Sequence, residues 1–392
     1  MLPLEGVTAV SVEHAVAAPF ASRQLADLGA RVIKIERPGV GDFARAYDAT
    51  VNGLASHFVW LNRSKESLTL NLKCPEGIEV LRRLLSRADV FIHNLAPGAL
   101  ERLGICAEDL RAEFPRLIIC DISGYGTSGP YRDKKAYDLL IQSETGLLSI
   151  TGTEQVPSKV GISIADIASG MYAFSAVLTA LLMRAQTGQG TKVEVSLLEA
   201  LSEWMGYPMY YTCYGGVPPP RTGASHAAIA PYGPYASGDG RVVYLGIQNE
   251  REWKRFCELV IERPEIAGHP HFSSNSARVQ YRERLDAMIV EVFASLSAED
   301  VIERLDRAQI ANARMNTVQE FLEHPQLAAR SRWRDVEAPN GRIRALIPPM
   351  TFEGVEPVMR PIPEVGEHTD AILREIGVDA STIAAWRQAG II

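Results

Sequence analysis

Asp166 is the residue whose type and position most readily support chemistry. It is the one carboxylate in "VGISIADIASGMYAFSAVLTALLM", an otherwise apolar or small segment of residues 160–183. One interpretation is structural: Asp166 caps a helix of about residues 167–186 that Gly188 ends, because an aspartate oxygen accepts hydrogen bonds from the free amides of a first turn. The other is chemical: Asp166 is a nucleophile, with Gly170 leaving room for a reactant. A helix N-terminus stabilises a charged carboxylate, so the two roles are compatible.

Two other patterns match binding motifs but lack their context. "GYGTSG", residues 124–129, fits the G-x-G-x-x-G dinucleotide fingerprint, yet the polar "PYRDKKAYD" follows it where an apolar helix should begin. His269 and His271 in "HPHFSS" have no third ligand nearby in the sequence. No G-x-S-x-G, H-E-x-x-H or Walker A pattern occurs. We therefore predict neither a dinucleotide nor a metal.

Composition bounds the class of protein. The 392 residues suggest two or three domains, and 40 basic against 47 acidic residues leave no basic stripe that would follow a phosphate backbone. The five cysteines lack zinc-ligand spacing and are typical of a reducing cytoplasm. Glu5 and Glu13 interrupt the N-terminus where a signal peptide needs an apolar core. The apolar window of residues 168–183 falls short of the ~20 residues of a membrane span. We expect a cytoplasmic protein that binds neither nucleic acid nor membrane.

The elements that must position Asp166 form an α/β pattern. Short β-branched segments alternate with amphipathic ones through the first half of the chain; the expected strands include "VTAVSV", "RVIKIE", "SLTLNL", "DVFIHN" and "RLIICDIS". Strands that alternate with helices predict a large, open, Rossmann-like parallel sheet covered on both faces. The Pro- and Gly-rich stretch "YGGVPPPRTGASHAAIAPYGPYASGDG" then marks a domain boundary.

Several separate stretches, read together and in order, resemble the family III CoA-transferases. This group contains formyl-CoA, carnitine and dicarboxylate CoA-transferases and the related α-methylacyl-CoA racemases. The matching stretches are "DLGARVIKIERPGVGD", "LNRSKESLTLNLKCPEG", "ADVFIHNLAPGALERLG", "RLIICDISGYGTSGPY", "AYDLLIQSETGLLSITG", "GISIADIASGMYA", "RAQTGQGTKVEVSLLEA" and "VGEHTDAIL". They cover most of residues 5–205 and part of the tail, and their collinear order is more specific than any one motif.

The resemblance implies a catalytic role for Asp166. In the family's pattern this Asp attacks an acyl-CoA thioester, gives an enzyme-bound mixed anhydride, and then carries CoA as an aspartyl-CoA thioester. The substrate is thus a coenzyme A thioester, and no permanently bound cofactor is expected. Tyr137 and Asp138 match a further catalytic segment. The racemases resemble one another in a proton-shuttling His at the place of Tyr137, whereas a Tyr suits hydrogen bonding to a developing oxyanion. The sequence therefore favours a transferase.

The resemblance also implies a set of residues that contact CoA. They are His14, Arg37, Leu70, Leu72, Lys73, Asn94, Leu95, Ala99, Arg102 and Lys135. Alternatives remain for several members. The two arginines could form solvated salt bridges, the two leucines of the third strand could simply pack in the core, and the histidine could be a core histidine.

The resemblance is closest to the branch that acts on dicarboxylates such as succinate, itaconate, mesaconate and citramalate. Val16 stands where formyl-CoA transferase has an active-site Gln, and that enzyme's glycine-tetrad loop is absent. A dicarboxylate needs a cation for its remote carboxylate. The candidates are Arg45, Arg221 and His226, each of which could equally be an ordinary surface residue.

The expected enzyme moves CoA from a donor such as succinyl-CoA to a small dicarboxylic acid. By resemblance, we expect a large domain over residues 1–205, a linker over 206–225, a small α/β domain over 226–325, and a C-terminal segment, 326–392, that returns to the large domain. The family also implies an interlocked homodimer. The alternatives are an acyl-CoA racemase or epimerase acting on a 2-methylacyl-CoA, an intramolecular mesaconyl-CoA transferase, and a non-catalytic CoA-binding protein.

Overall fold

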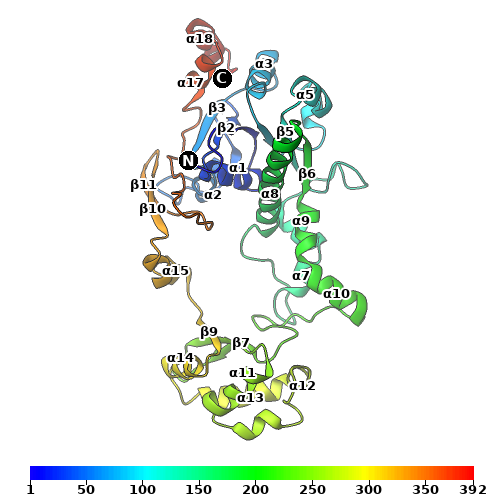
Figure 1. The fold of residues 1–392 in the computed structure, drawn as a ribbon, viewed down its shortest axis with the longest axis vertical. Helices are drawn as coiled ribbons and strands as arrows, with labels where there is room; N and C mark the ends of the chain where they lie inside the picture. The colour runs from blue at the N-terminus through cyan, green and yellow to red at the C-terminus, as the bar shows by residue number, and fades with distance from the viewer. The chain divides into compact units, whose positions relative to one another are not determined.

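The computed structural model describes residues 1–392 and divides into two compact units. Unit 1 comprises Met1–Thr145, Gly161–Met205 and Leu327–Ile392, and unit 2 comprises Gly146–Val160 and Gly206–Gln326. The chain therefore leaves unit 1 twice and returns twice (Figure 1). Residues 146–160, within the stretch that the sequence suggested for the large domain, belong to unit 2.

Unit 1 is built on a six-stranded sheet in the order β3-β2-β1-β4-β5-β6. Every neighbouring pair is parallel, as apolar runs predict for strands that are buried on both faces. The strands are β1 (Thr8–Val12), β2 (Arg31–Glu36), β3 (Lys65–Thr69), β4 (Val90–His93), β5 (Ile118–Ser123) and β6 (Lys192–Ser196). The predicted α/β class with a large parallel sheet is confirmed.

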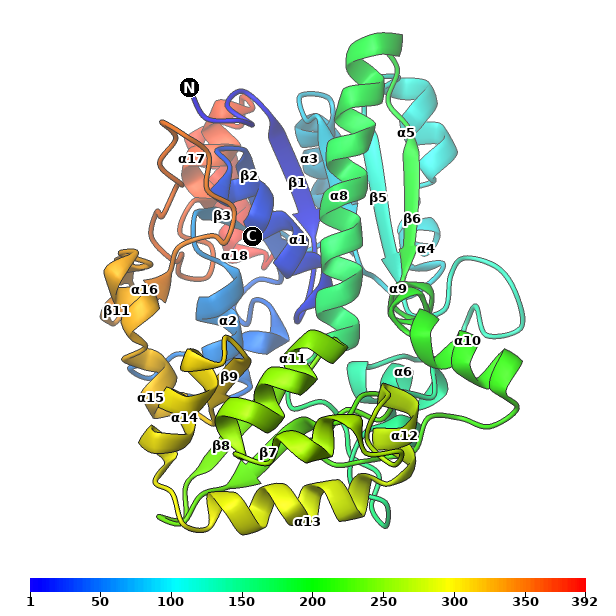
Figure 2. The ribbon, with the colours of Figure 1, turned by 60° about the horizontal axis from the view of Figure 1, so that its bottom comes forward.

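Helices cover both faces of this sheet. On one face α1 (Ala17–Asp27) packs against α8 (Ile164–Thr187), and α8 also packs on β5 and β6 (Figure 2). On the other face a single apolar cluster joins the strands to α3 (Pro75–Leu85), α5 (Ala107–Glu113), α17 (Thr369–Glu375) and α18 (Ala380–Gln388). The last 24 residues of the chain thus complete the core of its first half.

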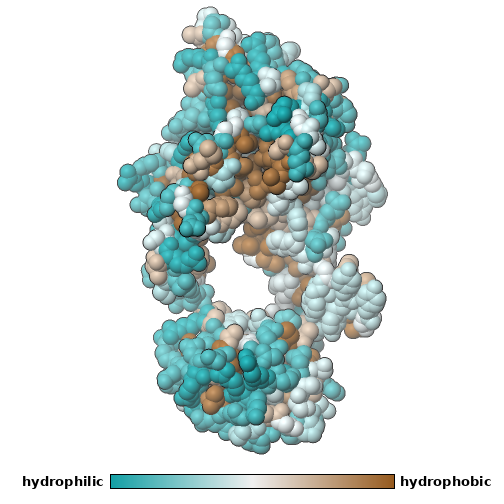
Figure 3. Space-filling view, in the orientation of Figure 1, coloured by the Kyte–Doolittle hydropathy of each residue, from teal (hydrophilic) through white to brown (hydrophobic).

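The α8 helix is, by length and composition alone, able to cross a membrane. In the structure 44% of its most apolar window is buried inside the protein, and the helix packs against α1, β5, β6 and α9 (Leu197–Trp204). Its remaining face exposes Met171, Tyr172, Leu182 and Met183. Figure 3 shows hydrophobic residues gathered on the face of unit 1 around α1 and α8.

The strand order reverses beside β1. The chain proceeds from β1 to β2 and β3 on one side and then to β4, β5 and β6 on the other. In open parallel sheets, ligands bind in the crevice at the carboxyl ends of the two strands where the order reverses. Here those strands are β1 and β4, so the turns that follow Val12 and His93 are the first places to look for a site.

The remaining elements of unit 1 connect or extend this sheet. They are η1 (Phe43–Ala46), α2 (Ser56–Leu61), α4 (Ala99–Arg102), α6 (Asp138–Glu144) and the antiparallel hairpin of β10 (Trp333–Ala338) and β11 (Gly341–Leu346). Val336 of the hairpin packs with Phe58 of α2 and Ile362 in a small separate core. The helix α16 (Pro325–Ala329) spans the junction of the two units.

Unit 2 has a core of its own around a three-stranded antiparallel sheet, β7-β8-β9. Its strands are β7 (Tyr232–Ala236), β8 (Val242–Gly246) and β9 (Ala311–Arg314). Its helices are α7 (Leu147–Ile150), α10 (Gly206–Gly215), α11 (Glu250–Arg255), η2 (Phe256–Val260), η3 (Pro264–Gly268), α12 (Asn275–Gln280), α13 (Arg282–Phe293), α14 (Ala298–Arg307) and α15 (Val318–Leu322). Arg278, 1% exposed, is neutralised there by Glu250 and donates to the Ala230 carbonyl.

Candidate active site

Asp166 lies in the first turn of α8, but it is not the cap of that helix. Ser163 occupies the N-cap position, so the expectation of a helix that begins after Asp166 is wrong, although Gly188 does end the helix with a φ of 74°. The free amides are capped from outside the helix by Asp138, whose Oδ1 accepts hydrogen bonds from the Ala165 N–H at 2.8 Å and the Asp166 N–H at 3.4 Å. The carboxylate of Asp166 is therefore left available for chemistry.

Two carboxylates meet at this end of α8, and this raises the proton affinity of one of them. Asp138 begins α6, and its second oxygen accepts a hydrogen bond from Gln142 Nε2 at 2.7 Å. Burial and the adjacent Asp138 charge raise the pKa of Asp166 to about 7. The sequence led us to expect that the helix N-terminus would keep Asp166 charged; here burial outweighs that effect. The side chain keeps partial solvent access, so Asp166 can titrate with the medium near neutral pH.

A glycine one turn further along α8 brings a second helix close to Asp166. Gly170 lies on the same face of α8 as Asp166, because residues four apart share a helix face. A Cβ at Gly170 would lie 2.7 Å from the Ala17 carbonyl oxygen and 3.1 Å from the Phe20 Cβ. Because Gly170 has no side chain, the N-terminal turn of α1 can approach α8 closely. This approach places the end of β1, which leads into α1, beside the first turn of α8.

His14 follows β1 at the point where the strand order reverses, and Asn94 of the β4 turn fixes it there. The His14 N–H donates to Asn94 Oδ1 and Asn94 Nδ2 donates to the His14 carbonyl, both at 2.9 Å. The imidazole stacks on Phe43 with ring centroids 5.3 Å apart. Burial lowers the pKa of His14, and Lys34 and Arg37 lower it further against the opposing effect of Asp42. The predicted CoA contacts His14, Arg37 and Asn94 thus lie together at the crevice.

Tyr47 belongs to the same site, although the sequence did not single it out. Burial raises the pKa of Tyr47, and the charges of Asp42 and Asp166 and the Tyr137 phenol raise it further, which places this phenol in the field of the Asp166 carboxylate. Its ring contacts those of Phe43 and His57, at 5.8 and 5.6 Å. Phe43 and Tyr47 lie at the two ends of η1 and His57 lies in α2, and their types and spacing match no known motif, so no sequence pattern marks them. The predicted Tyr137 precedes α6 and is 68% exposed.

The other predicted CoA contacts lie at several places in unit 1. Leu70 is 2% exposed within the sheet core, and Leu72 packs against that core. Leu95 and Ala99 line a cavity in the loop after β4 that continues to β5 and β6. Lys73, Arg102 and Lys135 have exposed side chains, and Arg102 donates to the Pro97 carbonyl at 3.4 Å. Leu70 and Leu72 thus serve packing, whereas the side chains of Lys73, Arg102 and Lys135 remain open to a ligand.

The candidates for a remote carboxylate are already engaged by their own chain. Arg45 donates to both oxygens of Glu36 at 2.8 to 2.9 Å and to the Pro363 carbonyl at 3.2 Å. Arg221, in unit 2, donates to three carbonyls of that unit, those of Ser149, Thr153 and Glu154. His226 Nδ1 accepts from the Ala228 N–H at 3.1 Å, and its ring stacks on Tyr232. Both guanidinium groups hold backbone in place and are not offered to a substrate.

Comparison with known proteins places this site in a family. The family model described as CoA-transferase family III matches residues 4–369. The chain is 30% identical over 395 residues to the succinyl-CoA:glutarate CoA-transferase of Homo sapiens, covering 100% of this chain and 90% of the human protein. It is 33% identical over 333 residues to the succinyl-CoA:D-citramalate CoA-transferase of Chloroflexus aurantiacus, covering 84% of this chain and 82% of that protein.

A solved structure agrees with the sequence comparisons. The crystal structure of a CAIB/BAIF family protein from Brucella suis superposes with a TM-score of 0.83 at 33% identity, covering 96% of this chain and 99% of that one. With 96% of the chain covered, the match extends over both units. The chain therefore belongs to the family III CoA-transferases and is a CoA-transferase.

Proposed function

We propose that this enzyme transfers CoA from succinyl-CoA, or a donor like it, to a small dicarboxylic acid through a covalent thioester on Asp166. The observation that supports it most directly is the partly buried Asp166 carboxylate in the first turn of α8. Asp138, and not Asp166, accepts the hydrogen bonds from the first amides of the helix, so the Asp166 carboxylate is free. Both relatives described above are named for a succinyl-CoA donor and a dicarboxylate acceptor, glutarate in one and D-citramalate in the other.

The reaction proceeds by exchange of one acyl group for another on Asp166. An Asp166 oxygen attacks the thioester carbon, the C–S bond breaks, and the CoA thiolate leaves a mixed anhydride. The thiolate then attacks Asp166 Cγ, the C–O bond to the anhydride oxygen breaks, and succinate departs. The acceptor carboxylate next attacks Asp166 Cγ of the aspartyl-CoA thioester, the C–S bond breaks, and a second mixed anhydride forms. The released thiolate then attacks the acyl carbon of the acceptor, the C–O bond to Asp166 breaks, and the product thioester and the free Asp166 carboxylate result. The bonds formed match those broken, so the exchange needs neither ATP nor a metal.

A panel of free acids tests the acceptor class. We expect succinyl-CoA to give product thioesters with glutarate, itaconate, mesaconate and D-citramalate at rates that exceed those with propionate or formate by about 10-fold or more, because a site that selects a polar group discriminates strongly against analogues that lack it. Product thioesters would be resolved by liquid chromatography and mass spectrometry. Preference for formate would contradict the dicarboxylate assignment, and preference for oxalate, the two-carbon dicarboxylate, would contradict the assignment to four- and five-carbon acids. Conversion of one mesaconyl-CoA isomer into the other without a free acid would support the intramolecular alternative.

Replacement of Asp138 by Asn shifts the acidic limb of the pH profile. Asp138 raises the pKa of Asp166 by its charge, and only the ionised Asp166 is nucleophilic, so kcat/KM rises as pH increases through the pKa of about 7. The Asp138→Asn variant removes the charge but keeps an oxygen that can accept from Ala165 and Asp166. We expect its acidic limb to lie about 1 pH unit lower. The matched control, Asp133→Asn, neutralises an exposed carboxylate in the preceding loop, and its profile should coincide with that of the wild type. If the pH profile of Asp138→Asn coincided with that of the wild type, the acidic limb would not report the effect of Asp138 on the pKa of Asp166, and the assignment would be refuted.

Self-association is the second part of the proposal. Besides the exposed apolar face of α8, unit 1 exposes Trp204 at the end of α9, and unit 2 exposes Tyr210 and Tyr214 of α10. Exposed large apolar side chains that form a patch mark protein interfaces, and a second copy of the chain is the occupant that the resemblance implies. A monomer in analytical ultracentrifugation at micromolar concentration would contradict it.

A further inference from the structure

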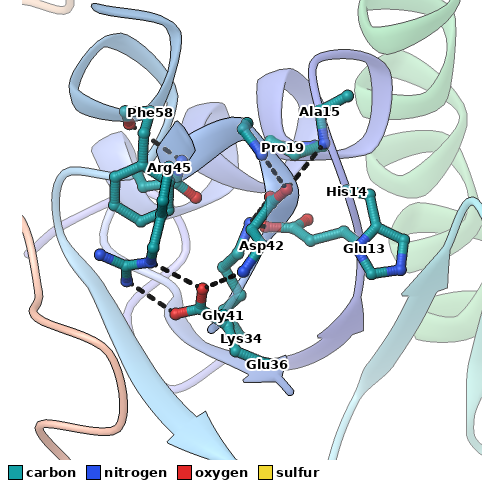
Figure 4. A network of polar contacts seen from close by, with 12 residues as sticks. Glu13, His14, Ala15, Pro19, Lys34, Glu36, Gly41, Asp42, Arg45 and Phe58 are labelled. Atoms are coloured by element: carbon teal, nitrogen blue, oxygen red, sulfur yellow. Dashed lines mark hydrogen bonds and ion pairs between the residues drawn. The ribbon is translucent and has the colours of Figure 1, made fainter. Parts of the chain in front are cut away.

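Four charged side chains are buried together beneath the β1–α1 turn. Glu13, Lys34, Asp42 and Lys65 are each 3% exposed or less. Lys65 Nζ donates to Glu13 Oε1 at 2.7 Å, Lys34 Nζ lies 3.5 Å from the same oxygen, and Lys34 Nζ donates to Asp42 Oδ2 at 2.7 Å. Figure 4 shows Asp42 between Lys34 and the turn, beside Glu13. Removing four charges from water costs several kcal/mol for each ion, so their placement demands an account beyond packing.

Asp42 is the member of this group that reaches the active-site turn. Its Oδ1 accepts hydrogen bonds from the Ala15 N–H at 3.3 Å and from the Ala44 N–H at 2.9 Å, while Oδ2 accepts from Lys34. Ala15 has a φ of 60°, a left-handed conformation that costs a non-glycine residue about 1 kcal/mol. The hydrogen bond to Asp42 and the Asn94 clamp on the adjacent His14 hold the turn in this conformation.

The Asp42 carboxylate also fixes η1, the element that leads to Tyr47. Asp42 is the N-cap of η1, through its bond to the Ala44 N–H, and η1 leads directly to Tyr47. The first residue of η1, Phe43, stacks on His14 and contacts Tyr47. One side chain therefore sets the positions of His14 at the end of β1 and of Tyr47 in the field of Asp166. Lys34, whose Nζ also lies 3.5 Å from Glu13 Oε1, keeps Asp42 itself from rotating through its bond to Oδ2.

We propose that Asp42 is a positioning residue for the reaction at Asp166: its carboxylate holds the left-handed His14–Ala15 turn and the start of η1 in register, so that the thioester meets a preformed site. The inference rests on the proposed function for its kinetic readout, but the turn itself is a property of the fold. The proposal predicts that kcat/KM depends on a hydrogen-bond acceptor oxygen at residue 42 and not on the negative charge of that residue.

Two double variants separate the acceptor from the charge. Lys34→Met removes the buried cation beside Phe58, so a neutral residue at position 42 leaves no unpaired charge, while Glu13 keeps Lys65. In Lys34→Met/Asp42→Asn the amide oxygen can still accept from Ala15 and Ala44; in Lys34→Met/Asp42→Ala nothing accepts. We expect the Asn variant to keep kcat/KM within about 5-fold of wild type and the Ala variant to lose about 30-fold or more, because misplacement by 1 Å can cost 10²-fold.

Affinity for CoA, measured by calorimetry, provides a readout that does not depend on turnover. We expect the Ala variant to bind free CoA at least about 5-fold more weakly than the Asn variant, because the His14–Ala15 turn is then held by Asn94 alone. Equal kcat/KM and equal CoA affinity in the two variants would overturn the proposal. If the Ala variant does not fold, Lys34→Met/Asp42→Ser replaces it, since a serine hydroxyl can still cap η1 but is one atom shorter toward Ala15. If the wild type transfers no CoA, the proposed function fails, and the affinity comparison still decides the role of Asp42.

Discussion

Replacement of Asp166 by Asn is expected to lower kcat for CoA transfer by about 10⁴-fold or more. An amide has nearly the shape of the carboxylate but its oxygen is not a nucleophile, and loss of an enzyme's nucleophile typically costs between 10⁴- and 10⁶-fold. The measurement is the rate of product thioester formation from succinyl-CoA and the best acid of the panel. Calorimetric CoA binding should persist, because the variant removes chemistry and not the crevice at the ends of β1 and β4.

A covalent adduct gives this prediction its second measurement. Wild-type enzyme mixed with succinyl-CoA and quenched with hydroxylamine should carry a hydroxamate on the peptide that contains Asp166, and Asp166→Asn should carry none. Asp133→Asn is the matched control, because it neutralises an exposed carboxylate nearby in the chain and should be labelled like the wild type. Activity above about 1% of wild type in Asp166→Asn, or a hydroxamate elsewhere, would place the nucleophile at another residue.

The fold was largely predictable because its signals are local and strong. Strands such as Ile118–Ser123 are buried on both faces and are therefore rich in apolar residues, three of its six being isoleucine, and helices of unit 1 separate most of the strands. The division of the chain was harder. The segment Gly146–Val160 joins unit 2 in space, whereas by composition it continues the α/β pattern around it. Contacts between segments distant in the sequence decide such membership, and composition does not record them.

The active site was predictable only where a residue's type determines its chemistry. Asp166 stood out as a lone carboxylate in an apolar segment, but a helix cap explained it as well as a nucleophile did, and only the resemblance to the family indicated the nucleophile. That Asp138 would cap α8 and raise the pKa of Asp166 could not be read from sequence, because the two lie 28 residues apart and meet only through the packing of α6 on α8. Arg45 and Arg221 were chosen by charge alone, yet their partners are mostly backbone carbonyls, which every residue type provides. Tyr47 was missed because its ring neighbours, Phe43 and His57, come from two separate short helices, η1 and α2, which only the fold brings together.

The group of buried charges beneath the turn leads to the largest expected change in stability. Replacement of Glu13 by Gln should lower the free energy of unfolding by about 3 to 5 kcal/mol, because it leaves Lys65 and Lys34 without the anion that lies between them. Gln keeps the shape and an acceptor for Ser22, so lost packing does not account for the effect. Urea unfolding at neutral pH measures it. The exposed Glu353→Gln serves as the control and should unfold like the wild type.

The pH dependence of this difference distinguishes a charge effect from a packing effect. Burial alone would raise the pKa of Glu13, but Lys65 and Lys34 reverse the shift and leave it below its usual value of 4.5. A carboxyl whose pKa is lower in the folded state stabilises the protein fully above its unfolded pKa, and that contribution is lost as pH falls through the folded pKa. The difference between wild type and Glu13→Gln should thus be constant above about pH 5 and shrink below it. Glu13→Gln/Lys65→Met, which removes the ion pair as a whole, should recover most of the loss; a double variant no more stable than Glu13→Gln would show that the cost arises from shape and not from an uncompensated charge.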